Sequence, residues 1–252
     1  MPVEVDEPKK KKKKRRRKNY LLRLLAVMAL GALSYYLLTS ALFDVQKVTV
    51  ENNSYYTKGQ IISKAEAKVG QNIFGVNTGR IKELLLDDPY IKSVRVKRSL
   101  PGTVVITVEE RCDAAAIPYS EIFIMIDKDG LVLRKSETEP QMTLLTGMTI
   151  KTMEEGRPLE VEETGALTGT LKIIEAMGSA DMFFKKIDIS SIKVKAYIYD
   201  QLICEGTPEN ILESMNSGNL ETVVYNLYTK GTERGIIYIG SDNYYSFSAI
   251  VE

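Results

Sequence analysis

The hydrophobic pattern of the chain opens with one long apolar run. From Leu24 to Phe43 there are 20 residues without a charged side chain. A helix rises about 1.5 Å per residue, so this run predicts a helix of about 30 Å, the hydrocarbon thickness of a bilayer. We therefore expect a transmembrane helix over 24–43. A cleavable signal peptide is the alternative, but its apolar core of about 7–15 residues is shorter than this run.

Past this run the pattern changes to alternating strands and short amphipathic helices. A strand over 44–50 is rich in β-branched residues. A helix capped by Thr57 and a second helix starting near Thr78 follow it. The apolar positions assigned to the first helix are Ile61, Ile62, Ala65 and Val69. Two alternating strands come next, joined by Leu100–Thr103, where Pro followed by Gly predicts a type II turn. The order is β-α-α-β-β.

From Ala114 onward the pattern favours short strands again. Two of them flank an acidic turn, Asp127–Gly130, which has too few carboxylates for an EF-hand. An apolar stripe at helical spacing then predicts a helix over about 164–177. Two strands are expected over 187–203.

The last part of the chain pairs helical and strand-like segments. A helical region begins at Pro208, which suits a first helical position, and Gly218 is expected to interrupt it. Two more strand-like runs, 235–239 and 244–251, end the chain. The predicted fold class is α+β, with an N-terminal transmembrane helix, a β-α-α-β-β unit and a mixed, β-rich second domain.

The distribution of basic residues around the apolar run predicts the orientation of the chain in the membrane. Ten consecutive basic residues, Lys9 to Lys18, precede the apolar run. Basic flanks of membrane helices stay in the cytoplasm and attract anionic lipids of the inner leaflet. We therefore expect a cytoplasmic tail over 1–23 and an extracytoplasmic remainder, with topology preferred over a nuclear-import or nucleic-acid patch. The residues expected to contact headgroups and set the topology are Lys14, Arg15, Arg16, Arg17, Lys18 and Arg23.

The overall charge of +1 hides two regions of opposite sign. Residues 1–23 carry 11 basic and 3 acidic side chains, which leaves 23 basic and 30 acidic residues for the rest. An acidic ectodomain offers no footprint for nucleic acid. Cys112 and Cys204 both lie in this part, either as a disulfide or as two free thiols. With no histidine and isolated cysteines, the sequence predicts no metal site and no cofactor.

A resemblance to a known family rests on residues spread through the β-α-α-β-β unit. They are GQNIF from Gly70 to Phe74, Val76, Pro89–Tyr90–Ile91, Val94, Val96, Arg98, Pro101 and Val108–Glu109–Glu110–Arg111. With a membrane helix just before it, this pattern resembles the POTRA domain of the FtsQ/DivIB bacterial cell-division proteins. The resemblance implies a POTRA domain over 44–112 and an FtsQ/DivIB-type β domain over 113–252.

Catalytic patterns are weak. Ser190–Lys193 fits S-x-x-K and Ser241–Asn243 fits S-D-N, two motifs of penicillin-binding enzymes. The third motif, K-T-G, is missing, and Ser190 lies among strand-forming residues, whereas the catalytic serine should open a helix. The acidic cluster between Glu154 and Glu163 contains Gly and Pro, as expected for a solvated loop. We therefore predict a protein that is not an enzyme.

Binding is the remaining class of function. The open edge of a sheet accepts a partner strand, and tyrosine is enriched at interfaces. The candidate partner-binding residues of the last strands are Ile236, Tyr238, Tyr244, Tyr245 and Phe247; core packing is the alternative for Tyr245 and Phe247. A second candidate surface is Arg95, Lys97 and Arg98, expected on the polar side of the POTRA sheet.

The resemblance also implies a function. FtsQ/DivIB-type proteins are non-catalytic scaffolds at the division septum. The implied partners are FtsL and FtsB/DivIC, with the septal wall synthase complex beyond them. Two alternatives stay open: a POTRA-bearing translocation or secretion component, and a membrane-anchored serine enzyme acting on the cell wall.

Overall fold

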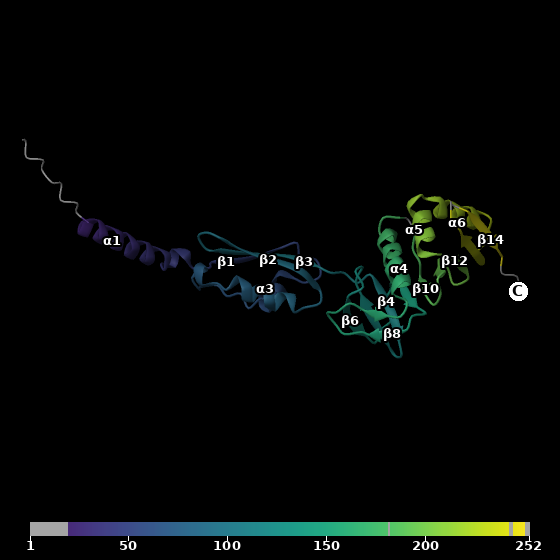
Figure 1. The fold of residues 1–252 in the computed structure, drawn as a ribbon, viewed down its shortest axis with the longest axis horizontal. Helices are drawn as coiled ribbons and strands as arrows, with labels where there is room; N and C mark the ends of the chain where they lie inside the picture. Colours follow the sequence, from purple (N-terminus) through teal and green to yellow (C-terminus); the bar gives the residue numbers. More distant parts are fainter. Residues whose placement is uncertain (1–19, 181, 242–243, 250–252) are drawn as a thin grey trace, which may run out of the picture.

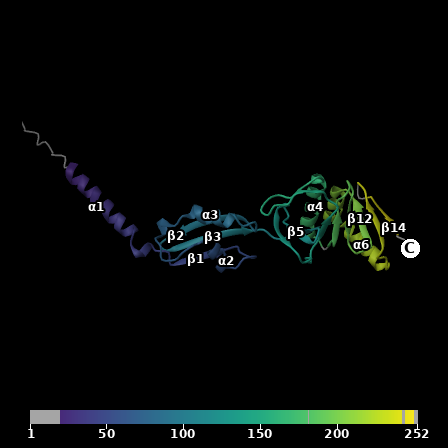
Figure 2. The same cartoon turned by 90° about the horizontal axis from the view of Figure 1, so that it is seen from below.

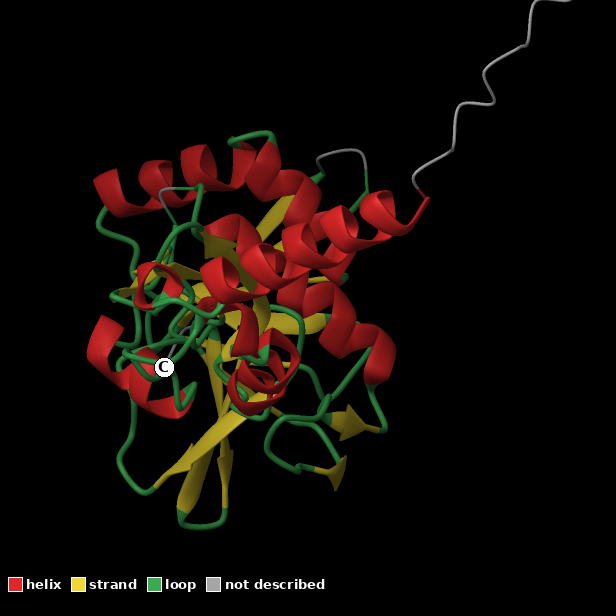
Figure 3. Cartoon of the chain, turned by 90° about the vertical axis from the view of Figure 1, so that its left-hand side faces the viewer, coloured by secondary structure: helices red, strands yellow, loops and turns green. Residues whose placement is uncertain are grey.

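The structure is a computed structural model that describes residues 20–180, 182–241 and 244–249. The chain is extended, with a helix, a first folded unit and a second folded unit following one another along the long axis (Figure 1). The view turned by 90° shows the same succession (Figure 2). Each unit contains both helices and strands, so the fold is α+β as predicted. Figure 3 shows the helices and strands of the described chain in a view along its long axis.

The apolar run forms helix α1 (Tyr20–Leu38), with a 3₁₀ turn η1 (Ala41–Phe43) after it. Among the described residues, α1 alone is long and apolar enough to cross a membrane. The helix begins four residues before the predicted segment. The helix ends at Leu38, and the hydroxyls of Thr39 and Ser40 donate to the carbonyls of Tyr35 and Leu37 in its last turn.

The first folded unit is the predicted β-α-α-β-β arrangement. Its elements in chain order are β1 (Lys47–Glu51), α2 (Lys58–Lys64), η2 (Ile73–Gly75), α3 (Thr78–Leu86), β2 (Ile91–Ser99) and β3 (Thr103–Glu110). The sheet order is β1-β3-β2, with β1 parallel and β2 antiparallel to the central β3. One face of this sheet packs on both helices in a closed core; the other face carries no helix.

Local sequence explains where the two helices start. Thr57 caps α2 in a capping box with Gln60, and Asn77 caps α3 by accepting from the Arg80 N–H. The predicted length of the first helix is wrong, because α2 ends at Lys64 and Glu66 takes a positive φ of 50°. Val69 therefore lies outside the helix and is exposed instead of in the core.

The predicted type II turn between β2 and β3 is also wrong. Gly102 does not take the positive φ that such a turn requires, and the Leu100–Pro101 peptide bond is cis. Glycine is needed at position 102 for another reason. A Cβ there would lie 2.5 Å from the carbonyl oxygen of Asp44, so the turn lies directly against the chain leaving the membrane helix.

Two carboxylates fix the loops at the far end of this unit. Glu110, the last residue of β3, accepts the backbone N–H groups of Ser54 and Tyr55 at 2.6 Å and that of Tyr56 at 3.2 Å. Asp88, after α3, accepts from Lys64 at 2.6 Å, the Tyr56 hydroxyl and the Tyr90 N–H. Burial alone would raise the pKa of Asp88, but these donors outweigh it and lower the pKa below its ordinary value.

The second folded unit is built on a nine-stranded mixed sheet of order β14-β13-β12-β11-β10-β7-β4-β5-β6. Its strands are β4 (Ala115–Tyr119), β5 (Ile122–Ile126), β6 (Val132–Ser136), β7 (Leu144–Thr146), β10 (Lys186–Asp188), β11 (Val194–Tyr197), β12 (Leu202–Gly206), β13 (Gly235–Ile239) and β14 (Tyr245–Ser248). A separate pair, β8 (Ile150–Thr152) and β9 (Glu160–Val161), lies beside it. The helices are α4 (Thr164–Met177), α5 (Pro208–Asn216) and α6 (Asn219–Thr229).

The core of this unit joins the helices to the sheet. The stripe of α4 predicted from sequence, Leu167, Leu171 and Ile174, is buried, together with Phe184 and Ile237. Pro208 opens α5, and Gly218 separates α5 from α6 with a positive φ of 72°, both as predicted. The two strands predicted over 187–203 are three strands instead, β10, β11 and β12.

Two further sequence predictions change here. Ile192, assigned to a strand, lies in a bend between β10 and β11 and is exposed. The disulfide alternative is wrong, because Cys112 is exposed and Cys204 is buried in the core, and both are free. Burial raises the pKa of the Cys204 thiol to about 12, so this side chain behaves as a small apolar group.

Candidate partner-binding edge

The last strand, β14, forms one edge of the nine-stranded sheet. It pairs antiparallel with β13, with Ile237 opposite Phe247 and Ile239 opposite Tyr245. Among the described residues, no strand lies on the other side of β14. Four aromatic residues lie at or beside this edge: Tyr238, Tyr244, Tyr245 and Phe247.

The backbone of β14 has a definite pattern of outward groups. The Gly240 N–H donates to the Tyr244 carbonyl, which makes Ile239 and Tyr245 a non-hydrogen-bonded pair. Because antiparallel pairs alternate, the N–H and C=O groups of Tyr245 and Phe247 point away from β13. The outward groups of Phe247 are the ones that an added strand would bond.

The side chains of β14 facing the helices are partly used inside the domain. The Tyr245 hydroxyl lies 2.6 Å from the buried Ser214 hydroxyl of α5. Phe247 stacks on Gly235, where a Cβ would clash with the ring and where φ is 148°. Phe247 remains exposed at its outer side. The core alternative weighed for these two residues therefore describes Tyr245 better than Phe247.

The other candidates divide between surface and half-buried positions. Tyr244, just before β14, is exposed, and so is Tyr238 of β13. Ile236 is half-buried and shares its sheet face with Tyr238, because the two lie two residues apart on one strand. The five candidates therefore lie at one end of the sheet but on both of its faces. Tyr245 and Phe247 share the face of Ile237 and Ile239, whereas Ile236 and Tyr238 lie on the opposite face.

The three residues of the second candidate surface lie on opposite faces of the sheet. Arg95 and Lys97 lie on the helix-free face of the POTRA sheet and are exposed. The placement of Arg98 beside them is wrong, because alternation along β2 turns it to the opposite face, where its guanidinium donates to the Val76 carbonyl at 2.7 Å. Arg98 therefore ties β2 to the loop before α3.

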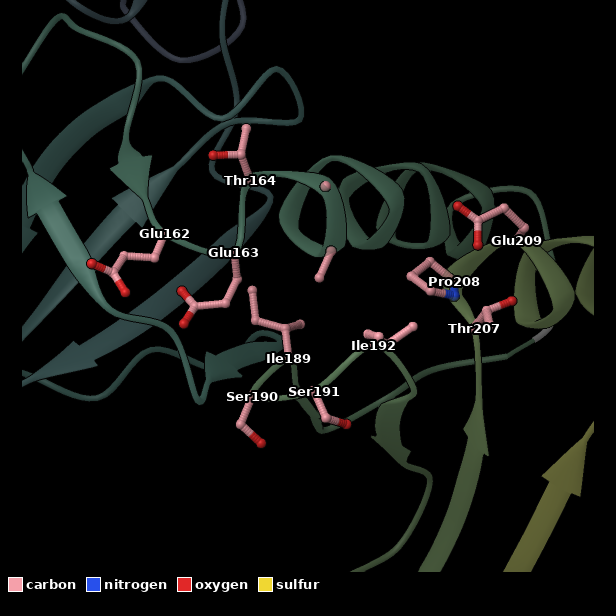
Figure 4. A pocket seen from close by; sticks show the side chains of 12 residues that line it. Glu162, Glu163, Thr164, Ile189, Ser190, Ser191, Ile192, Thr207, Pro208 and Glu209 are labelled. Atoms are coloured by element: carbon pink, nitrogen blue, oxygen red, sulfur yellow. The ribbon is translucent and has the colours of Figure 1, made fainter.

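The possible catalytic serine lies in a different place, at a cavity of about 540 Å³ beside the first turns of α4 and α5. Ser190 is in a bend and does not open a helix. Its hydroxyl and that of Ser191 point away from the carboxylates of Glu162 and Glu163 (Figure 4). Asp242 and Asn243 of the second motif lie outside the described residues. Ser190 lies against the Asp188 carboxylate, and its backbone N–H donates to that group at 2.9 Å. Its position in a bend differs from the helix start at which the S-x-x-K serine is expected.

Comparison with known proteins agrees with this architecture. Residues 43–111 match the family model described as "POTRA domain, FtsQ-type". The chain is 29% identical over 182 residues to the cell division protein DivIB of Clostridium acetobutylicum, an alignment that covers 69% of this chain and 71% of the relative. It is 32% identical over 119 residues to DivIB of Clostridium tetani, covering 46% and 45% of the two chains.

A third relative carries the other name of the family. It is the cell division protein FtsQ of Syntrophotalea carbinolica, 24% identical over 149 residues, which cover 58% of this chain and 51% of the relative. The chain is thus similar to the FtsQ/DivIB proteins, and residues 43–111 match their POTRA domain. The names of these relatives support a role in cell division, and helix α1 is a candidate membrane-spanning segment by its length and composition.

The basic residues that the charge pattern predicts at the inner side of the membrane lie mostly outside the described residues. Lys14, Arg15, Arg16, Arg17 and Lys18 lie outside the described residues. Arg23 is exposed on the first turns of α1. Its long side chain is positioned to extend toward the headgroups beside the N-terminal end of the helix.

The junction between the two folded units is a polar site that sequence reasoning missed. The Tyr90 hydroxyl donates to Asp113 at 2.7 Å and accepts from the Arg134 Nε at 2.8 Å, while Arg134 also bonds Asp113. Burial raises the pKa of Tyr90, and the Asp113 carboxylate raises it further. Tyr90 is one of the residues on which the family resemblance rests, but no sequence pattern predicted its contact with Arg134.

A second set of charges crosses the same junction. Arg111, the last residue of the family motif, pairs with the buried carboxylate of Asp127 and with Asp129 at 3.2 Å. Lys92 of β2 reaches Asp129 at 2.8 Å, and this hydrogen bond lowers the Asp129 pKa. The acidic turn predicted from sequence is therefore a docking point for the POTRA domain.

Proposed function

We propose that this protein is a non-catalytic scaffold of the bacterial division machinery. It would sit at the septum with its basic tail in the cytoplasm and both folded domains outside. There it would bind FtsL and FtsB/DivIC, and through them help to organise septal peptidoglycan synthesis. The similarity to the FtsQ/DivIB proteins supports the division role, and the outward edge of β14 supports the mode of binding.

The unpaired edge of β14 is the single observation that carries the partner site. A strand added there would bond the outward N–H and C=O groups of Phe247. The exposed rings of Phe247 and Tyr244 flank this edge, where they offer apolar surface that a partner strand with matching side chains would cover. Arg95 and Lys97 on the POTRA sheet remain a second, electrostatic candidate surface.

The binding test compares two substitutions at one position. Phe247→Pro removes the outward N–H, and Phe247→Ala keeps it while deleting the same ring. We expect both variants to bind the cognate FtsL–DivIC pair more weakly. The proline variant should bind about fivefold to tenfold more weakly than the alanine variant, because it loses one further hydrogen bond. Equal affinities of the two variants would exclude strand addition as the mode of binding.

The cellular test uses the intact chain with a fluorescent protein on its cytoplasmic tail. A band at midcell that narrows with constriction is the expected result. A uniform envelope signal in dividing cells would instead favour the translocation or secretion alternative. Ser190→Ala tests the enzyme alternative in the same cells, since a scaffold should divide normally without that hydroxyl.

A further inference from the structure

The end of the membrane helix is closed by the POTRA domain. The four last carbonyls of a helix lack partners within the helix, and inside a membrane they need partners from the protein. In α1, Thr39 bonds the carbonyls of Tyr35 and Tyr36, and Ser40 bonds that of Leu37. The last carbonyl, of Leu38, accepts from the Asn72 side chain of the POTRA domain at 2.8 Å.

This contact fixes the depth of the POTRA domain. A 19-residue helix is about 28 Å long, close to the hydrocarbon thickness of a bilayer of about 30 Å. Leu38 thus lies at the outer boundary of the hydrocarbon. A further layer of about 5–7 Å on each side holds the polar headgroups. Because Asn72 touches Leu38, the POTRA segment around Asn72 must lie in that layer.

Three segments of the chain meet at this end of the domain. Asp44 forms a β-bridge with Asn72, and the Phe43 and Phe74 rings contact each other with centroids 5.4 Å apart. Gly102 of the β2–β3 turn lies against Asp44. We call the surface formed by residues 42–43, 69–74 and 100–101 the membrane-proximal tip.

The membrane-proximal tip exposes large apolar side chains. The exposed fractions are 56% for Leu42, 64% for Val69, 44% for Phe74 and 59% for Leu100. Phe74 comes from the 3₁₀ helix η2 and Leu100 from the turn between β2 and β3. Lys47 and Lys68 are exposed beside the tip and can reach lipid phosphates. Apolar residues bordered by lysines are typical of a surface that enters the headgroup layer.

We propose that the membrane-proximal tip of the POTRA domain inserts into the outer interface of the bilayer. Phe74 and Leu100 enter the boundary between headgroups and acyl chains, next to the end of α1. The domain is then held to the membrane at two places, the helix and the tip, and its long axis keeps a defined direction. This inference rests on the membrane anchoring in the proposed function, and it is separate from the partner edge on β14.

Tryptophan fluorescence can test this insertion directly, because the chain contains no tryptophan. Single-tryptophan variants of the full chain would be reconstituted into vesicles of phosphatidylcholine and phosphatidylglycerol, with bromine on the acyl chains. The variants are Phe74→Trp and Leu100→Trp at the tip and Leu30→Trp in the middle of α1. Tyr119→Trp is the matched control, because Tyr119 is 43% exposed like Phe74 but lies in the second domain.

We expect lipids with bromine on the acyl chain near the headgroup to quench the tryptophan emission of both tip variants. Lipids with bromine near the end of the acyl chain should quench the emission of Leu30→Trp. Tyr119→Trp should lose no emission in either case. If Leu30→Trp is quenched and neither tip variant is, the inference is overturned while the membrane anchor stands. Quenching of Tyr119→Trp to the same extent would also overturn it, since contact would then not be specific to the tip. If Leu30→Trp itself is unquenched, the anchor fails and the inference fails with it.

The vesicles contain no other protein, which separates lipid from a protein partner. A tip that is unquenched in these vesicles but protected in the assembled division complex would be a protein-binding surface, contrary to the proposal. The two tip variants come from different segments, so misfolding of one, seen by circular dichroism, leaves the other as the test.

Discussion

Glu110 gives the sharpest test of how the POTRA domain is held together. One carboxylate at the end of β3 accepts three successive backbone N–H groups, from Ser54, Tyr55 and Tyr56, and also lies 3.3 Å from the Ser54 hydroxyl. These donors form the loop between β1 and α2. Glu110→Gln keeps the size of the side chain but replaces one acceptor oxygen by a donor that faces N–H groups.

The size of the effect follows from these bonds. A hydrogen bond to a charged group contributes about 1.5–3 kcal/mol to stability. The sum of three such bonds is an upper limit for the loss in Glu110→Gln. Glu110 is only half-buried, so water replaces part of what is lost. We therefore expect the opening free energy of this loop to fall by about 2 kcal/mol, which is about 30-fold in the opening equilibrium.

Amide hydrogen exchange of the full chain in nanodiscs measures this opening at the donors themselves. The N–H groups of residues 54–56 should exchange about 30-fold faster in Glu110→Gln, in proportion to the opening equilibrium. Glu109→Gln is the matched control, because the Glu109 carboxylate accepts from the Ser93 hydroxyl on the outer face of the sheet. Unchanged exchange of residues 54–56 in Glu110→Gln, or equal acceleration by Glu109→Gln, would refute the reasoning.

Three further changes have definite expected outcomes. Asp88→Asn should cost about 1–2 kcal/mol near neutral pH. The pKa of Asp88 is lower in the folded state than in the unfolded state. Its stabilising effect is therefore complete above the unfolded pKa near 4 and is lost as the pH falls through the folded pKa. Urea titrations of the wild type and the variant should accordingly give the same stability in acid. Gly147→Ala should lower the free energy of unfolding by about 2–4 kcal/mol in the same titrations, because φ is 80° at Gly147 and a Cβ there would clash with Asp188. Gly165→Ala is the control: a Cβ at Gly165 meets no other atom, so this change should be neutral or slightly stabilising. Tyr245→Phe should lower the thermal midpoint by leaving a buried hydroxyl of α5 unpaired, yet leave partner binding unchanged, since the outward groups that a partner strand would bond are on the backbone of Phe247.

The sequence was informative where structure depends on neighbours along the chain. Thr57 and Pro208 mark the starts of α2 and α5, and both act at short range, through a capping hydrogen bond and a fixed φ. The 3.6-residue stripe of α4 located its buried face correctly. The five candidate residues of the partner edge were found because they cluster within twelve positions, and their role there remains a prediction.

The sequence failed where the outcome depends on distant parts of the fold. Val69 and Ile192 are apolar, and a periodic pattern assigns such residues to a core, but both lie in turns whose paths are set by tertiary contacts. Arg98 was grouped with its basic neighbours although alternation along β2 reverses its direction. The junction of Tyr90 and Arg134 joins residues 44 positions apart, which no local pattern reveals.

The position of β14 at one end of the nine-stranded sheet sets a length requirement on any partner rooted in the same membrane. Strands are about 4.8 Å apart, so β14 lies about 38 Å from β6, and the nine residues of β2 span about 30 Å more along the POTRA domain. The two units follow each other away from α1 (Figure 1). A partner with its own membrane helix would have to bridge about 70 Å before reaching the edge, the length of a continuous helix of about 45 residues. With the long axis perpendicular to the membrane, a membrane-bound partner with a shorter stalk would not reach β14, whatever its affinity for that strand.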